Sequence, residues 1–191
     1  MIYAIACVDK DSLAIGYQGE LIYHIKEDMK FFKEMTTIGL GTVLIMGRKT
    51  YESVGDLPGR STIVVSSRKI KPADSKAVFT NLKAALFTVD LMKRVPTSRI
   101  VICGGGEIYK AFLEHCEYVF LTEVSRDGKF NIQADAYFPD EIRDESKWKK
   151  VNKSDIRYAN QYGETVSYQI NTYKNLNING EEIIKLYGGE K

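Results

Sequence analysis

Short apolar runs that alternate with helical patterns constrain the fold of this chain more than any other feature of its sequence. Five such runs, bounded by turn residues, predict buried strands at residues 2–8, 42–46, 62–66, 99–103 and 118–123. Helical patterns fall between them, at residues 28–35, at residues 48–54, around residues 82–89 with Asn81 as N-cap, and from Glu107 onward. Strands and helices in this order predict a largely parallel sheet with helices on both faces.

The C-terminal part of the chain shows strand patterns alone. Residues 147–158 and 165–173 alternate around a turn at residues 160–163, which predicts an antiparallel hairpin at the edge of the sheet. We therefore expect one α/β domain over residues 1–174, with a central, mostly parallel twisted sheet, helices on both faces and a C-terminal antiparallel hairpin. Residues 175–191 are expected to form a C-terminal extension, whose role the sequence does not indicate.

Composition excludes several classes of protein. A chain of 191 residues, 44% of them hydrophobic, can bury the core of one domain. Its 27 Lys and Arg residues nearly balance its 25 Asp and Glu residues, so neither nucleic acid nor a membrane surface is an expected partner. No apolar run is long enough to span a membrane, and the N-terminus has no basic leader. The spacing of Cys7, Cys103 and Cys116 suits neither disulfides nor a metal site, so we expect a cytoplasmic protein without a metal.

One carboxylate lies on the apolar side of a predicted helix. In the stretch YHIKEDMKFFKEMT, Asp28 shares a helical stripe with Ile25, Phe31, Phe32 and Met35. An ionised carboxylate that is buried without a partner costs several kcal/mol or gives up its charge. Either Asp28 is misplaced on this stripe, or a cationic group belongs beside it.

Three predicted strands end in groups that suit anions. These groups are Gly47, Arg48, Lys49 and Thr50 after one strand, Ser66, Ser67 and Arg68 at the end of the next, and Gly104, Gly105 and Gly106 after a third. Ligands of open α/β sheets bind outside the carboxyl ends of the strands, and glycines before a helix let the backbone approach a pyrophosphate. The cations Arg48, Lys49 and Arg68 favour NADPH over NADH. A tight turn for the glycines and a solvated charged face for the cations are the alternative interpretations.

A further arginine follows a turn. The sequence LPGR places Arg60 directly after Leu57, Pro58 and Gly59. A guanidinium can bind the carboxylate of a substrate with two parallel hydrogen bonds. The alternative is an ordinary surface arginine after a β-turn.

In their order and spacing, these pieces resemble dihydrofolate reductase over about residues 1–174. The matching segments are AIG at residues 14–16, EDMKFFKEMT, VLIMGRKTYESVG, LPGR, VVSSR, ICGGGEIY, LTEV and ADAYFP. The resemblance implies an enzyme that reduces 7,8-dihydrofolate to 5,6,7,8-tetrahydrofolate by hydride transfer from NADPH. Such an enzyme supports one-carbon and thymidylate metabolism, and antifolate inhibitors are possible further ligands. A monomer is expected rather than a dimer.

The resemblance also implies a set of site residues. Asp28 would orient and polarise the pterin ring while a water delivers the proton, Tyr23 would hydrogen-bond a water near the site, and Thr122 would support Asp28. The substrate pocket would be formed by Ile5, Cys7, Met29, Phe32, Val54, Leu57 and Arg60, with Arg60 on the glutamate α-carboxylate. The cofactor would be bound by Ala6, Ile15, Gly16, Gly47, Arg48, Lys49, Thr50, Ser66, Ser67, Arg68, Cys103, Gly104, Gly105, Gly106, Glu107, Ile108 and Tyr109.

The chain departs from the family's pattern at a few positions. Ile22 and Tyr23 stand where the family usually has a proline and then a tryptophan, so we expect changed loop dynamics and inhibitor response rather than lost activity. Glu107 stands where some relatives have a basic residue that assists the cofactor phosphate.

Three other functions fit parts of this pattern. The reductase of riboflavin biosynthesis shares the fold and the use of NADPH, but its members generally lack a carboxylate at the position of Asp28. A nucleotide-binding paralogue without catalysis would bind NADPH and leave dihydrofolate unreduced. An α/β scaffold for protein partners would leave both the three glycines and the buried acid unexplained.

Overall fold

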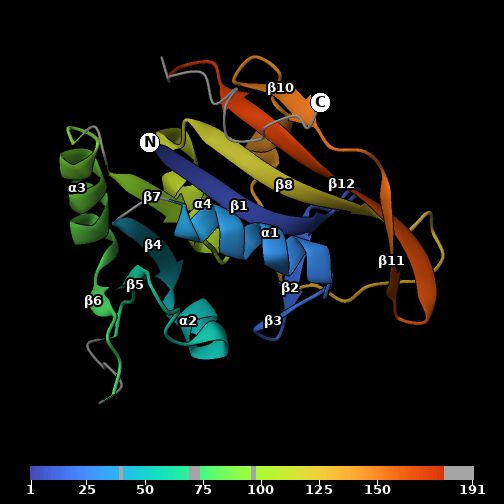
Figure 1. The fold of residues 1–191 in the computed structure, drawn as a ribbon, viewed down its shortest axis with the longest axis horizontal. Helices are drawn as coiled ribbons and strands as arrows, with labels where there is room; N and C mark the ends of the chain where they lie inside the picture. Colours follow the sequence, from blue (N-terminus) through green and yellow to red (C-terminus); the bar gives the residue numbers. More distant parts are fainter. Residues whose placement is uncertain (39–40, 69–73, 96–97, 179–191) are drawn as a thin grey trace.

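The computed structural model describes residues 1–38, 41–68, 74–95 and 98–178. The strands are β1 (Ile2–Asp9), β2 (Ala14–Tyr17), β3 (Glu20–Leu21), β4 (Thr42–Gly47), β5 (Ser61–Val65), β6 (Val78–Thr80), β7 (Arg99–Ile102), β8 (Tyr118–Ser125), β9 (Ala136–Tyr137), β10 (Trp148–Lys153), β11 (Arg157–Gln161) and β12 (Glu164–Asn175). The helices are α1 (Lys26–Thr37), α2 (Arg48–Val54), α3 (Leu82–Met92) and α4 (Gly106–Phe112), with short 3₁₀ turns at Leu113–His115 and Asp140–Arg143 (Figure 1). None of the described helices is long and apolar enough to cross a membrane.

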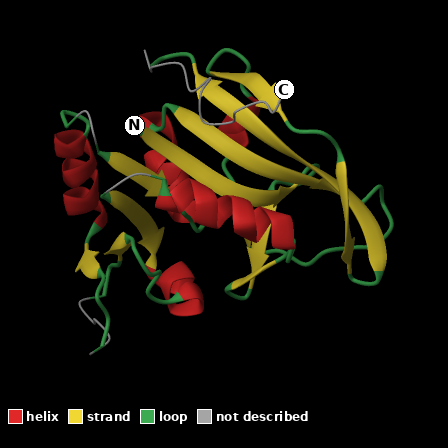
Figure 2. Cartoon of the chain, in the orientation of Figure 1, coloured by secondary structure: helices red, strands yellow, loops and turns green. Residues whose placement is uncertain are grey.

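Most of the strands form one large sheet (Figure 2). Its order is β10-β12-β8-β1-β7-β4-β5-β6, and β11 pairs with β12 beside β10. The strands from β8 to β6 in this order run parallel, whereas β12 runs antiparallel to β8, β10 and β11. The expected mostly parallel sheet with an antiparallel C-terminal hairpin is confirmed. Because β1, β4, β5 and β7 are parallel, their carboxyl ends meet at one edge.

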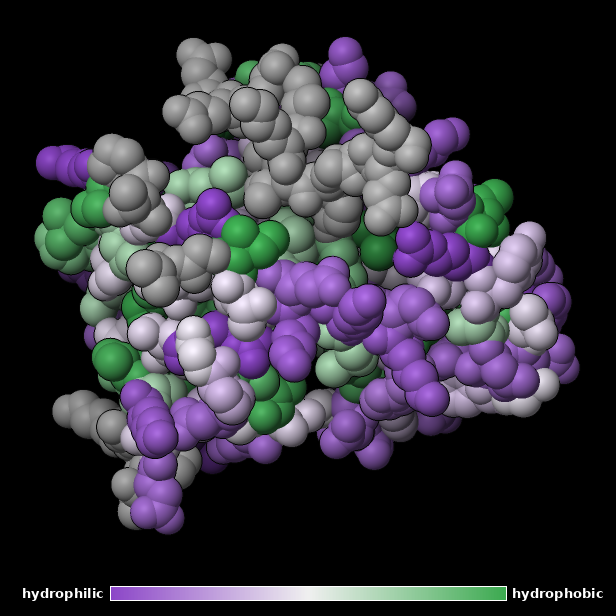
Figure 3. Space-filling model, in the orientation of Figure 1, coloured by the Kyte–Doolittle hydropathy of each residue, from purple (hydrophilic) through white to green (hydrophobic). Residues whose placement is uncertain are grey.

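The two faces of the sheet are covered by different helices. Along β1, Tyr3 and Ile5 pack in the hydrophobic cluster that includes Phe31 and Met35 of α1. Ala4 and Ala6 point the other way, into the cluster formed with residues of α3 and α4. Figure 1 shows α1 lying across one face of the sheet, and Figure 3 shows that the outward surface over α1 is hydrophilic. Strand β1 therefore serves both layers through alternate residues.

The local structure agrees with the predicted elements at most positions. Asn81 caps α3 as expected, because its Oδ1 accepts a hydrogen bond of 2.9 Å from the N–H of Ala84. The expected single strand over residues 147–158 is wrong, since β10 ends at Lys153 and β11 begins at Arg157. The reason lies at Ser154, whose Oγ accepts the hydrogen bond from the N–H of Ile170 and so replaces a backbone carbonyl in the ladder.

The C-terminal end of the last strand is tied to the body of the domain. The Asn175 side chain is buried, and its Nδ2 donates to the Cys116 carbonyl at 3.0 Å. The N–H of Leu176 then donates to the Lys147 carbonyl at 2.8 Å. The extension predicted for residues 175–191 lies outside the described residues beyond Ile178, so its boundary and role stay a prediction.

Candidate active site

Helix α1 brings the predicted acid onto the sheet. Asp28 is only 7% exposed and shares its side of the helix with Phe31 and Met35, which are 5% and 2% exposed. Within the part of the chain that the structure describes, no lysine or arginine contributes to the pKa of Asp28. The carboxylate is therefore buried as the helical stripe predicts, and the cationic group expected beside it is not a basic side chain of the described residues.

Two neighbouring strands supply the polar groups nearest to this acid. Burial raises the pKa of the Asp28 carboxyl above its usual value, and an interaction with Thr122 on β8 opposes the rise. The Thr122 hydroxyl is itself buried and makes no hydrogen bond of good geometry within the described residues. Cys7 on β1 lies opposite Thr122, and burial followed by the nearby Asp28 charge raises the pKa of its thiol. Thr122 and Cys7 thus flank the acid on the sheet.

The predicted substrate-binding residues divide by exposure. Ile5 and Cys7 are buried on β1, and Phe32 and Leu57 are partly buried against the same cluster as Ile5. Met29 and Val54 are 50% and 46% exposed. A ring held by Asp28 would cover apolar side chains that solvent now reaches.

Arg60 carries a charge that no acidic side chain neutralises among the described residues. Its Nη1 donates to Thr36 Oγ1 at 2.8 Å, and its Nε donates to the Pro58 carbonyl at 3.2 Å. Both acceptors are neutral, and Thr36 lies in the last turn of α1. The guanidinium is thereby held in place at the end of α1, with its charge available for a carboxylate.

Two helix N-termini meet where β4 and β7 end. Helix α4 follows Gly105 and α2 follows Gly47, and neither has a side chain that caps its first N–H groups. The N–H of Gly47 donates to the Gly104 carbonyl at 2.7 Å, which joins the two strand ends. Apart from the two chain neighbours of Gly105, the one described atom that a Cβ there would have within 4 Å is Thr50 Oγ1, at 3.6 Å. Uncapped N–H groups beside an open glycine backbone fit a pyrophosphate.

The other glycines of this turn are required by packing. A Cβ atom on Gly106 would lie 2.7 Å from the Tyr137 carbonyl oxygen, and one on Gly104, which has φ +92°, would lie 2.7 Å from the Tyr109 ring. The Tyr109 hydroxyl donates to the Ile5 carbonyl at 2.7 Å, so α4 is fixed to β1 directly below the glycines. The remaining predicted cofactor residues of this region are the buried Ala6, Ile15, Gly16 and Ile108, the half-buried Cys103 and the exposed Glu107.

The predicted phosphate-binding cations differ in their partners. Arg48 forms an ion pair with Glu52 one turn further along α2, so a phosphate would have to compete with this carboxylate. Lys49, Ser67 and Arg68 are exposed. The N–H of Arg68 donates to Ser66 Oγ at 3.0 Å, which shapes the turn after β5. These groups lie after the parallel neighbours β4 and β5 and so share one edge of the sheet.

Tyr23 lies in the loop before α1 and is 2% exposed. Its hydroxyl donates to Asp9 Oδ2 at 2.8 Å, so the proton of the hydroxyl is committed to Asp9. The oxygen retains lone pairs with which it could accept from a water. The predicted contact of Tyr23 with a water near the site is thus compatible with this geometry, and its hydroxyl has a protein partner that the sequence did not suggest.

Sequence reasoning missed several polar groups around this loop. Asp9 is fully buried and also accepts a hydrogen bond of 3.1 Å from Arg126 Nε. Asp135 holds the loop from another side, since its Oδ2 accepts from the N–H of Gln18 and its own N–H donates to the Gly16 carbonyl, both at 3.0 Å. None of these contacts is local in sequence, so no motif marks them.

Fold and site together indicate a class of protein. The parallel strands whose carboxyl ends share one edge, with a glycine turn there and a buried acid on α1, are typical of α/β proteins that bind a nucleotide. The sequence model of the family described as dihydrofolate reductase matches residues 1–175. The chain therefore belongs to the dihydrofolate reductase family.

Individual relatives agree with this assignment. The dihydrofolate reductase of Neisseria meningitidis serogroup A is 34% identical over 158 residues, which cover 82% of this chain and 88% of the relative. That of Bacillus subtilis is 33% identical over 153 residues, which cover 80% and 82%. A solved structure of dihydrofolate reductase from Enterococcus faecalis, complexed with NADP(H) and RAB-propyl, has a TM-score of 0.72 and 27% identity and covers 92% of this chain and 96% of that one.

Proposed function

We propose that this chain reduces 7,8-dihydrofolate to 5,6,7,8-tetrahydrofolate with NADPH. Membership of the dihydrofolate reductase family and the names of its relatives support this activity. The single observation that carries it is Asp28, an acid that is 7% exposed on the apolar side of α1 and forms no ion pair with a cation of the described residues. Such a group is stabilised by a ligand that donates hydrogen bonds to it.

In the proposed complex, Asp28 accepts two hydrogen bonds from the pterin ring. A pterin presents a ring N–H beside an exocyclic amine, an edge that matches the two oxygens of a carboxylate. The reacting imine accepts a hydride well only when its nitrogen is protonated, and a nearby negative charge favours the protonated form. Asp28 therefore orients and polarises the ring while a water supplies the proton. Thr122 supports the carboxylate from β8.

The rest of the substrate would be bound by side chains that lie between Asp28 and Arg60. Ile5, Phe32 and Leu57 belong to one apolar cluster and would line the side of the ring and the benzoyl group, while Met29 and Val54 would cover the outer side. Arg60, held by Thr36 and otherwise unneutralised in the described structure, would bind the α-carboxylate of the glutamate. The substrate would thus span from Asp28 at one end of α1 to Arg60 beside the other.

NADPH supplies the hydride when it is bound. The uncapped N-termini of α2 and α4, joined by the Gly47–Gly104 hydrogen bond, would hold the pyrophosphate. Lys49 and Arg68, with Arg48 after it leaves Glu52, would bind the extra phosphate that distinguishes NADPH from NADH. The buried Tyr109 connects this edge to Ile5 and would fix the distance between cofactor and substrate.

We further propose a cytoplasmic monomer in which residues 1–174 are sufficient for activity. The three free cysteines, two of them buried and one half-buried, suit a reducing compartment. Light scattering on the purified chain tests the monomer, and a chain that ends at Lys174 tests whether residues 1–174 are sufficient for turnover.

The deciding experiment follows the absorbance of NADPH after dihydrofolate is added, with NADH in a parallel assay. Oxidation of NADPH that depends on dihydrofolate, with far slower oxidation of NADH, is the expected result. Binding of NADPH without oxidation would instead identify a nucleotide-binding paralogue. Oxidation that depends on a ribosylaminopyrimidine and not on dihydrofolate would identify the related pyrimidine reductase.

A further inference from the structure

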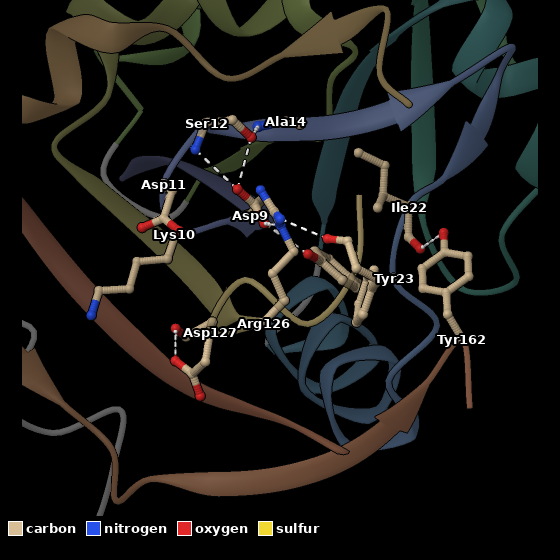
Figure 4. A network of polar contacts seen from close by, with 12 residues as sticks. Asp9, Lys10, Asp11, Ser12, Ala14, Ile22, Tyr23, Arg126, Asp127 and Tyr162 are labelled. Carbon is tan, nitrogen blue, oxygen red and sulfur yellow. Dashed lines mark hydrogen bonds and ion pairs between the residues drawn. The ribbon is translucent and has the colours of Figure 1, made fainter. Parts of the chain in front are cut away.

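A buried polar network that the proposed mechanism does not use lies next to the site (Figure 4). At its centre is Asp9, the last residue of β1, which has no exposed surface. Its Oδ1 accepts from the N–H and Oγ of Ser12 at 2.9 and 2.8 Å. Its Oδ2 accepts from the Tyr23 hydroxyl at 2.8 Å and from Arg126 Nε at 3.1 Å. Burial alone would raise the pKa of Asp9, but hydrogen bonds from Ser12, Tyr23 and Arg126 together hold it below its usual value.

The ion pair between Asp9 and Arg126 is built into the sheet. Strands β1 and β8 are parallel neighbours, and Asp9 lies opposite Val124. Arg126 follows directly after the end of β8, two residues beyond Val124, and its Nε reaches Asp9 Oδ2 at 3.1 Å. Its Nη1 also donates to the Phe130 carbonyl at 2.7 Å, which fixes the guanidinium at a second point. The register of β1 on β8 and the contact with Phe130 thus hold the Arg126 guanidinium beside Asp9.

Through Tyr23 the network reaches the loop that precedes the acid-bearing helix. Burial, followed by the hydrogen bond to Asp9, raises the pKa of the Tyr23 hydroxyl, so this group remains a neutral donor. Tyr23 packs in the same hydrophobic cluster as Cys7 and Ile25. The Cys7 thiol is near enough to Asp28 for the Asp28 charge to raise its pKa. Cys7 is therefore a neighbour of both the network and the predicted acid.

The side chains of β1 that point to the face of the predicted acid form a continuous row. Ile5, Cys7 and Asp9 are separated by two residues each and so point to the same face. Ile5 and Cys7 form part of the predicted substrate wall, and Asp9 extends that wall toward the loop. A buried ion pair is often no more stabilising than apolar residues of similar size. The Asp9–Arg126 pair is therefore better explained by the position in which it holds the Tyr23 side chain.

We propose that Asp9 and Arg126 are positioning residues of the reductase site. As an ion pair they hold the Tyr23 hydroxyl, and through Tyr23 they fix the loop before α1 and the end of the substrate wall next to Asp28. This inference rests on the proposed reduction of dihydrofolate. It predicts that loss of the hydroxyl disturbs the placement of the pterin and leaves the cofactor site, at the ends of β4, β5 and β7, unchanged.

The test compares Tyr23→Phe, Asp9→Asn and the double variant in single-turnover hydride transfer. Tyr23→Phe is expected to slow hydride transfer about tenfold or more, because small misplacements of reacting groups cost this much. Its KM for NADPH should equal that of the parent. Because the two residues act as one unit, the double variant should be no slower than the slower single variant. Tyr173→Phe, which removes another tyrosine–carboxylate hydrogen bond, to Glu123, is the matched control and should leave the rate unchanged.

Each outcome decides one question. A Tyr23→Phe rate equal to that of the parent, or additive losses in the double variant, would overturn the positioning role. Equal changes in the KM for NADPH and the KM for dihydrofolate would show that the network only stabilises the fold, and this would overturn the proposal as well. If Asp9→Asn does not fold, Arg126→Gln takes its place in the same comparison, because Tyr23→Phe alone also removes the predicted contact of Tyr23 with a water near the site. A parent chain that oxidises no NADPH with dihydrofolate would instead overturn the proposed function, and this inference with it.

Discussion

Replacement of Asp28 by asparagine tests both the chemistry and the energetics of the site. The amide has nearly the shape of the carboxylate but no charge, and it offers one acceptor oxygen where Asp28 offers two. A hydrogen bond to a charged group contributes about 1.5–3 kcal/mol. Asp28 is only 7% exposed, so water does not screen this interaction, and the loss of one such bond and weakening of a second costs about 3–4 kcal/mol. Asp28→Asn should therefore lower kcat/KM for dihydrofolate by about two to three orders of magnitude near neutral pH.

The loss of kcat/KM in Asp28→Asn should depend on pH, and this dependence distinguishes the proposed role of Asp28 from a general loss of activity. The substrate arrives already protonated at low pH, so the variant should partly recover as the pH falls, whereas the affinity for NADPH should stay constant throughout. NADPH oxidation is followed from acidic to neutral pH for parent and variant together. Equal pH–rate profiles for the two proteins would refute the assignment of Asp28.

The same variant should unfold less easily than the parent at neutral pH. Burial raises the pKa of Asp28 in the folded protein, so folding disfavours the charged form, and its contribution to stability is lost as the pH rises through the folded pKa. Each tenfold increase in proton affinity corresponds to about 1.4 kcal/mol. Urea denaturation should show Asp28→Asn to be the more stable protein at pH 7, and the difference should vanish below about pH 4, where the unfolded carboxyl is also protonated. A variant less stable than the parent at pH 7 would contradict the raised pKa.

Three further predictions address the other parts of the site. Arg60→Ala should raise the KM for dihydrofolate about a hundredfold, since it removes charge-assisted bonds to the glutamate, and should leave a pteridine without that tail unaffected; equal losses for both substrates would exclude the carboxylate contact. Thr122→Val removes the interaction that lowers the pKa of Asp28, so the acidic limb of the pH–rate profile should move to higher pH, and a shift to lower pH would contradict the assigned contact. Gly105→Ala should keep the melting temperature of the parent, because its Cβ atom would contact Thr50 Oγ1 at an ordinary 3.6 Å and no other described atom beyond its chain neighbours, yet it should weaken NADPH binding about tenfold. Gly106→Ala, whose Cβ atom would lie 2.7 Å from the Tyr137 carbonyl oxygen, should lose stability instead. Unchanged NADPH affinity in Gly105→Ala would place the pyrophosphate elsewhere.

The parts of the fold that the sequence predicts are those with a repeating physical pattern. Continuous apolar runs mark β1, β4, β5, β7 and β8 because parallel strands are buried on both faces. The period of α1 marks Asp28, since a charged group on an apolar stripe stands out against its neighbours. Strands β2, β3 and β9 have between two and four residues, which is too short for any period to appear.

The polar network around Asp9 shows why the rest could not be predicted. Asp9 is followed by Lys10 and Asp11, so in sequence it looks like the start of a solvated turn, whereas in the structure it is fully buried. Its ionic partner Arg126 is 117 residues away and reaches it only through the register of β1 on β8. The pairing of Arg48 with Glu52 likewise depends on side-chain choices that a pattern of residue types leaves open.

The position of β1 also has a consequence for how the protein is made. This strand leaves the ribosome well before its partners, because Ile2 pairs with Ile100 and Tyr3 pairs with Tyr118. Until β7 has emerged, the apolar residues of β1 have no sheet to join, and the growing chain exposes them to chaperones and to other unfinished chains. Translation that stops before β7 would therefore yield no partly active enzyme, only a polypeptide prone to aggregate.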